Sequence, residues 1–261
     1  MKRTMLCVLA LGLLLVCGCP KSANEAFQEG VLAFQKGDYD TAIADYTEAI
    51  RLDPKLVEAY YKRGVTYRQK GDYDRAIADS TEAIRLNPKY AAAYCNRGIA
   101  YGLKGETDKE IADYTEAVRL NPKHADAYCN RGIAYGLKGE TDKEIADYTE
   151  AVRLNPKCVD AYYNRGIAYG QNGETDKAIA DFTEAIQVNP TYADAYCNRG
   201  MTYGQRGETD KAITDFTEAI RLDPKDALAY YGRGRVYDKN GENAKAKEDF
   251  AQAKKLGYKS P

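Results

Sequence analysis

The feature that most constrains this chain is a repeat of 34 residues that fills nearly all of it. Two glycine columns and one proline column recur at this interval. Self-similarity at a fixed period of this size is typical of arrays in which one small unit stacks on the next. The columns are Gly30, Gly64, Gly98, Gly132, Gly166, Gly200 and Gly234; Gly37, Gly71, Gly105, Gly139, Gly173, Gly207 and Gly241; and Pro54, Pro88, Pro122, Pro156, Pro190 and Pro224.

Seven units without insertions account for residues 23–260. The third and fourth units differ only where Ala92 is replaced by Asp126 and His124 by Cys158, which indicates duplication of a whole unit. Such a chain buries its apolar residues between neighbouring units and not in one central core. The predicted units are 23–56, 57–90, 91–124, 125–158, 159–192, 193–226 and 227–260.

Within a unit, the pattern predicts a first helix followed by a tight turn. In the third unit, Tyr94, Gly98 and Tyr101 follow one another at intervals of four and three, so they lie on one face of a helix. Gly105 then ends this helix, because glycine readily takes the left-handed conformation of a helix cap.

A second helix follows the turn. Thr107 and Glu110 have the spacing of a capping box at its start. Asn121 precedes Pro122, and a residue before proline is driven out of helical geometry, so the helix ends there. No strand pattern is present in the sequence, and the predicted fold class is all-α.

The unit resembles the tetratricopeptide repeat. This resemblance implies a right-handed α-solenoid of seven helix-turn-helix units whose concave face binds a peptide or protein segment. Three columns depart from the family: tyrosine replaces the first aromatic residue, which is often tryptophan, Glu110 and Glu144 replace the small residue of the second helix, and an arginine precedes the first glycine in six units. The resemblance is carried by the period and by Tyr94, Gly98, Tyr101, Tyr114, Ala117 and Pro122 in the family's order.

The arginine column requires partners, because a buried cation without a counter-charge is costly. An aspartate column supplies them, and two pairings fit the spacing. We expect each aspartate to bind the arginine of the following unit, beginning with Asp45 and Arg63, because Asp45 lies in a unit that has Glu29 instead of arginine. Pairing within a unit is the alternative.

The first residues are predicted to be a targeting segment and not part of the fold. Residues 1–18 combine a basic start with an apolar run too short to span a bilayer, as in a signal peptide. Val16-Cys17-Gly18-Cys19 resembles the cleavage site of bacterial lipoproteins, which implies acylation of Cys19 and a lipid-anchored tether over 19–22. An ordinary secretory signal is the alternative.

This resemblance implies location in the bacterial cell envelope. Pro20 follows the acylated cysteine in place of the aspartate associated with inner-membrane retention, so we expect an outer-membrane lipoprotein facing the periplasm. Display on the cell surface and a Gram-positive host remain open.

The two ends of the array are predicted to be polar. The aliphatic columns of the second helix become Lys247 and Lys254 in the last unit, whereas Glu25 and Glu29 occupy the Ala and Arg columns of the first. Terminal repeats require a polar outer face, so we expect a monomeric array with both ends capped.

The resemblance places the first helices along the concave wall and makes them the peptide-binding surface. Asparagine amides there can pair with the backbone of an extended peptide, and aromatic residues at the N-terminal end are expected to dominate the binding energy. Gly102, Gly136, Gly170 and Gly204 either leave the wall low for a ligand or are merely tolerated. The predicted groove residues are Phe27, Val31, Phe34, Tyr61, Val65, Asn96, Ile99, Asn130, Ile133, Asn164, Ile167 and Asn198.

Composition argues against other functions. The chain has one histidine, and no nucleophile–base pair or paired-carboxylate cleft is visible, so we expect no enzyme activity, no cofactor and no metal. A site formed by His124, Cys129 and Cys158 is the one conceivable metal arrangement. Lys and Arg total 38 against 39 Asp and Glu, which disfavours nucleic acid.

The sequence therefore predicts a membrane-anchored interaction scaffold. The alternative is an assembly or adaptor factor for an envelope machine such as a pilus, a secretin or a cell-wall enzyme complex. An RNA-binding helical repeat and an enzyme are the further alternatives.

Overall fold

The computed structural model describes residues 21–259, and within them it contains fourteen α-helices and no strand. Consecutive helices form seven antiparallel pairs, which confirms the predicted all-α solenoid. The helices are α1 (Ala23–Gln35), α2 (Tyr39–Leu52), α3 (Val57–Gln69), α4 (Tyr73–Leu86), α5 (Ala91–Leu103), α6 (Thr107–Leu120), α7 (Ala125–Leu137), α8 (Thr141–Leu154), α9 (Val159–Gln171), α10 (Thr175–Val188), α11 (Ala193–Arg206), α12 (Thr209–Leu222), α13 (Ala227–Lys239) and α14 (Asn243–Lys255).

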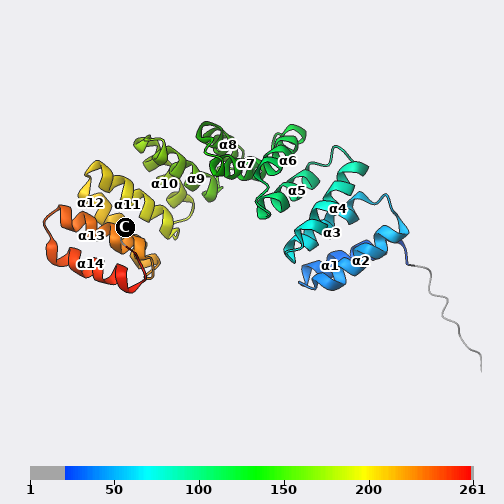
Figure 1. Cartoon of the computed structure of the whole chain (residues 1–261), viewed down its shortest axis with the longest axis horizontal. Coiled ribbons are helices and arrows are strands. Elements are labelled where there is room, and N and C mark those ends of the chain that lie inside the picture. The colour runs from blue at the N-terminus through cyan, green and yellow to red at the C-terminus, as the bar shows by residue number, and fades with distance from the viewer. Residues whose placement is uncertain (1–20, 260–261) are drawn as a thin grey trace, which may run out of the picture.

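The pairs stack into an open arch, with α1–α4 at one end and α11–α14 at the other (Figure 1). Each odd-numbered helix contacts the next odd-numbered helix, whereas the even-numbered helices of the described chain do not contact one another. The odd-numbered helices therefore lie on the inner, tighter radius of the arch. They form its concave wall, as the resemblance implies.

The helix ends follow from the glycine and proline columns. Gly105 and its six equivalents have φ between 71° and 81°, so they take the predicted left-handed conformation. Asn121 is extended at φ −131°, and α6 ends just before it. The capping box expected at Thr107 was wrong: Thr107 is already helical, and Glu106 precedes the helix without a side-chain cap bond.

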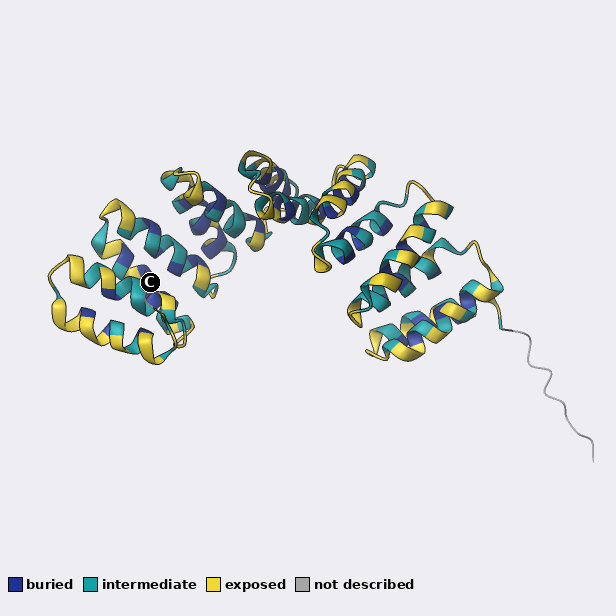
Figure 2. Cartoon of the chain, viewed as in Figure 1, coloured by how far each residue is buried: buried dark blue, intermediate teal, exposed yellow. Residues whose placement is uncertain are grey.

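The core is a narrow strip that runs between the helices of each pair and on into the next unit, as the dark residues along the arch in Figure 2 show. Between units, Ala117 and Val118 of α6 pack with Ala127 of α7. One aromatic ring from the even-numbered helix fills the centre of most pairs: Tyr114 and Phe182 are 1% and 2% exposed. The first glycine column makes room for these rings, because an added Cβ on Gly98 would lie 3.1 Å from the ring of Tyr114.

The arginine column pairs within each unit, so the expected pairing across units was wrong. Arg63 binds Asp79 through two nitrogens at 2.8 Å, and the same pattern recurs as far as Arg233 and Asp249. A third nitrogen of Arg63 donates to Thr47 Oγ1 of the preceding unit at 2.9 Å. Each arginine thus joins its own helix pair to the preceding one.

Asp45, whose unit has Glu29 at the position of the arginine column, is bound by Lys21 instead. Lys21 also pairs with Glu29, so it stands in for the missing arginine. At the other end of the array, Lys247 and Lys254 are exposed on α14. The predicted signal segment 1–18, Cys19 and Pro20 lie outside the described residues. Within residues 21–259, no helix is long and apolar enough to cross a membrane.

Candidate functional site

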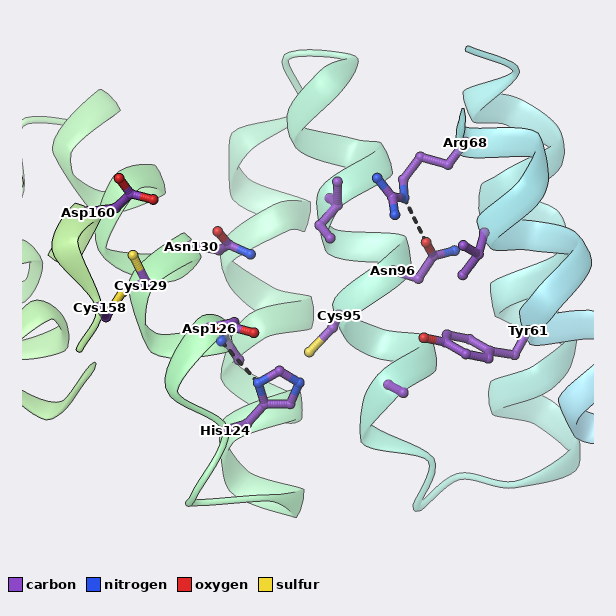
Figure 3. A pocket seen from close by; sticks show the side chains of 14 residues that line it. Tyr61, Arg68, Cys95, Asn96, His124, Asp126, Cys129, Asn130, Cys158 and Asp160 are labelled. Carbon is purple, nitrogen blue, oxygen red and sulfur yellow. Dashed lines mark hydrogen bonds between the residues drawn. The ribbon is translucent and has the colours of Figure 1, made fainter. Parts of the chain in front are cut away.

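A cavity of about 440 Å³ opens on the concave wall where α3, α5 and α7 meet the start of α9 (Figure 3). Its lining mixes an aromatic residue, Tyr61, with amides, thiols and two carboxylates. The repeat produces this cavity, because the first helices of three successive units turn residues at equivalent positions toward the same space. It is the best-defined site in the region where the sequence predicted a groove.

A polar chain crosses one side of this cavity. Arg68 Nε donates to the side-chain carbonyl of Asn96 at 2.8 Å, and the Asn96 amide donates to Ser80 Oγ at 2.9 Å. Ser80 occupies the position at which Tyr46 and Tyr114 bury a ring, so the space of the missing ring is available to Asn96. Asn96 is consequently only 3% exposed.

The four asparagines of the predicted groove therefore do not share the same surroundings. The expectation that Asn96 faces a ligand was wrong, because protein groups occupy its amide on both sides. Asn198 donates to Tyr163 Oη and to the Asp194 carbonyl, both at 2.9 Å. Asn130 and Asn164 make no side-chain hydrogen bond to other described residues, and of these two only Asn130 lines the cavity.

The acidic side of the cavity is formed by Asp126 and Asp160, which occupy equivalent positions in the fourth and fifth units. Both carboxylates are exposed, and neither forms an ion pair within residues 21–259. The neighbouring Asp194 shows the effect of such crowding: burial and repulsion by Asp226 and Asp223 raise its pKa. This edge of the groove carries uncompensated negative charge.

The lone histidine has a structural role. His124 Nδ1 accepts a hydrogen bond from the backbone N–H of Ala127 at 3.3 Å, which caps α7. No group of three or more His, Cys, Asp or Glu side chains that could hold a metal occurs in the described part of the chain. The arrangement of His124, Cys129 and Cys158 does not form such a group.

Two thiols of the cavity, those of Cys95 and Cys129, are protonated at neutral pH. Burial raises the pKa of both Cys95 and Cys129 to about 12, and Cys158 lies within hydrogen-bonding reach of Cys129. A thiol is nucleophilic only as the thiolate, so these residues do not supply an activated nucleophile. All four cysteines of the described chain are free.

The predicted groove residues are distributed unevenly. Tyr61, Val65, Asn96, Ile99 and Asn130 line the cavity. The remaining predicted residues lie outside it, and two of them pack on rings of their own unit: Phe27 on Tyr46 and Phe34 on Tyr39. Those outside the cavity are Phe27, Val31, Phe34, Ile133, Asn164, Ile167 and Asn198.

Arg68 was missed among the candidates. It is the one cation in a column that otherwise holds Phe34, four glycines and Asp238, and this exception was readable in the sequence. The idea that Gly102 lowers the wall for a ligand was also wrong, because the carboxylate of Glu110 fills that space.

Solved structures with the same architecture come from several proteins. A crystal structure of MamA is 33% identical, with a TM-score of 0.59, and covers 63% of this chain and 96% of its own. A tetratricopeptide repeat protein from Parabacteroides merdae is 24% identical, with a TM-score of 0.67, and covers 92% of this chain and 95% of its own. YrrB, described as a TPR protein with an unusual peptide-binding site, is 24% identical, with a TM-score of 0.63, and covers 70% of this chain and 95% of its own.

Family models match along most of the array, whereas no curated protein sequence matches. The model described as TPR repeat matches residues 30–67, 65–105, 103–139 and 137–173. One model described as tetratricopeptide repeat matches residues 159–192 and 193–226, and a second matches residues 216–248. With the stacked helix pairs and the first-helix wall already established, these matches show that the chain belongs to the tetratricopeptide repeat family.

Proposed function

We propose that this protein is a scaffold of the bacterial cell envelope, anchored by a lipid on Cys19, that binds an extended peptide segment of a partner protein in its concave groove. Tetratricopeptide repeat proteins are generally non-enzymatic scaffolds that bind peptides or proteins. The sequence of residues 1–22 supports the anchor and the envelope location. Two acyl chains are sufficient for stable attachment to a membrane.

The observation that carries the binding site is the cavity between α3 and α9. Asn130 presents an amide donor and acceptor that make no hydrogen bond to other described residues, and Tyr61 presents a half-buried ring about two units away. An extended peptide can pair its backbone with the amide and place a side chain against the ring. YrrB, with its described peptide-binding site, has the same architecture.

Residue-specific photocrosslinking tests the groove. A photoreactive amino acid at position 130 should trap one partner in intact cells, whereas the same amino acid at Ala112, exposed on the outer helix α6, should not. Adding Tyr61→Ala should reduce the yield at position 130, because it removes the aromatic contact. Equal crosslinking from both positions would contradict the proposed groove.

The anchor has its own test. The natural chain should incorporate labelled palmitate and remain with the membrane fraction, and Cys19→Ser should abolish both. Retention of the label in Cys19→Ser would contradict lipid attachment at this residue and leave the groove proposal unaffected.

A role as assembly or adaptor factor is the second candidate. The carboxylates of Asp126 and Asp160 beside Asn130 favour a partner segment with basic side chains. Peptide mapping of the crosslink at position 130 would show whether such a segment belongs to an envelope machine.

A further inference from the structure

A second, larger cavity lies at the other end of the concave wall. It has a volume of about 690 Å³ and is formed mainly by α11, α13 and Tyr258, which follows α14. Met201, Tyr231 and Val236 contribute apolar surface to it, and the ring of Phe216 lies buried beneath them, 1% exposed. Tyr258 stacks on Tyr231 with ring centroids 4.1 Å apart, so the C-terminal residues form one of its walls.

Glycines shape the floor of this cavity. An added Cβ on Gly232 would lie 2.5 Å from two ring atoms of Phe216, so the ring packs directly against the backbone of α13. Four preceding units have asparagine at this position, and such a side chain would collide with the ring. An added Cβ on Gly204 would lie 3.3 Å from Val236. The apolar floor therefore depends on the absence of side chains at these two positions.

The rim differs from that of the first cavity in both charge and polarity. Leu228, 40% exposed, occupies the position of Asp126 and Asp160. Arg235 replaces the aliphatic residue of the earlier units, and Lys239 follows one turn later. Both cations line the cavity and are exposed, and within residues 21–259 neither forms an ion pair.

Asp238 is the one carboxylate in the lining, so the two cations exceed it by one charge. An apolar cavity with excess positive charge at its rim fits a ligand that joins a large apolar group to an anionic one. A cation in the same place would be repelled by Arg235 and Lys239 and would lose its hydration on entering. The two cavities on this wall consequently select opposite charges.

We propose that this cavity binds a partner segment in which an aromatic side chain is flanked by carboxylates. The ring lies against Met201 and Tyr231, and the carboxylates bind Arg235 and Lys239. This inference relies on the proposed function only in taking the partner to be a peptide. The cavity is separate from the one at Asn130, so the two can fail independently.

Three short peptides test the proposal: acetyl-Gly-Ser-Asp-Phe-Asp-Ser-Gly-amide and two relatives in which the central residues are Lys-Phe-Lys or Asp-Ala-Asp. Binding is followed by the backbone amide resonances of Gly204 and Gly232, with those of Asn96 and Asn130 as reporters of the first cavity. The Asp-Phe-Asp peptide should shift the resonances of Gly204 and Gly232 and bind at least about tenfold more tightly than either relative.

The matched variant is Arg235→Ile with Lys239→Gln, which installs residues that earlier units carry at the same positions, Ile167 and Gln171. It should fold normally, as circular dichroism can verify, and lose at least about tenfold in affinity. Lys55→Gln with Lys225→Gln removes two exposed loop charges elsewhere and should leave the affinity unchanged.

Three results would overturn the proposal: equal affinity for the Lys-Phe-Lys peptide, shifts confined to Asn96 and Asn130, or unchanged affinity in the Arg235→Ile, Lys239→Gln variant. Loss of crosslinking at position 130 would bear on the first cavity alone. If the Asp-Phe-Asp peptide binds this second cavity but crosslinking at position 130 fails, the present inference holds and the groove proposal does not.

Discussion

The carboxylate of Glu110 occupies the space that a side chain on Gly102 would fill, with Oε1 2.5 Å from the position of an added Cβ. Glu110 is 8% exposed, and its Oε2 has no hydrogen-bond partner. Glu144 and Gly136 repeat the arrangement in the next unit. Burial raises the pKa of both glutamates, because the charged form loses its hydration without gaining a partner.

The first prediction concerns the pH dependence of stability. A carboxyl group whose pKa is raised in the folded state favours folding below its unfolded pKa, and this contribution is lost as the pH rises through the folded pKa. Glu110→Ala should therefore resemble the natural chain near pH 4 and exceed its unfolding free energy by about 1 kcal/mol at pH 8. Urea unfolding followed by circular dichroism at several pH values measures the difference.

The test variant is compatible with the fold, and a second variant serves as the control. Glu110→Ala reproduces the combination of Gly170 with Ala178, which the fifth unit already tolerates. Glu116→Ala removes an exposed carboxylate paired with Arg119 and should change stability by less than about 1 kcal/mol at any pH. If the difference in unfolding free energy between Glu110→Ala and the natural chain does not grow between pH 4 and pH 8, burial does not destabilise the charged form of Glu110.

The second prediction concerns the arginine–aspartate pairs. Asp113→Ala leaves the guanidinium group of Arg97 largely buried without its counter-charge, and we expect a loss of about 3 kcal/mol in unfolding free energy. A double-mutant cycle should give strong coupling of Asp113 with Arg97. The cycle of Asp113 with Arg131 should be additive within about 0.5 kcal/mol. Stronger coupling with Arg131 would mean that the pairs cross between units.

The third prediction concerns the polar chain beside the cavity. Ser80→Ala removes the acceptor of the Asn96 amide, which is then buried without a partner, and should cost about 1 to 3 kcal/mol. Ser80→Ala combined with Asn96→Ala should restore part of this loss, because no polar group is then left unpaired. Urea unfolding of the three variants provides the comparison, and an equal or larger loss in the double variant would contradict the account.

The fourth prediction concerns the turn glycines. Gly105 has φ +75° and no atom within 4 Å of an added Cβ, so a substitution there acts through the backbone alone. Gly105→Ala should cost about 1 kcal/mol, and Gly105→Asn should cost less, because asparagine tolerates the left-handed region better. Thermal unfolding would rank the two, and equal stability of Gly105→Ala and the natural chain would refute the conformational argument.

Much of the fold could be predicted because repetition supplies independent copies of each local signal. Gly105 and Pro122 mark the helix ends through their own backbone restrictions; six further units repeat the glycine and five repeat the proline. The candidate site was predicted less well. Tyr61 and Asn130 line a cavity, whereas Phe27 and Phe34 pack within their own unit. Whether a helical face is exposed depends on which side chains of neighbouring helices cover it, and the periodicity of the sequence does not contain this information.

The sequence by itself determined the helix pairs, their number and their stacking, since glycine, proline and apolar spacing act over a few residues. Only the tertiary structure decided which aspartate each arginine binds, because partners 16 or 18 residues away are equally compatible with the period. It also decided that Asn96 faces Ser80 and that Glu110 fills the space over Gly102. Those contacts arise where the sequence of one unit differs from that of the others. The difference leaves a space between the helices, and a side chain within reach fills it.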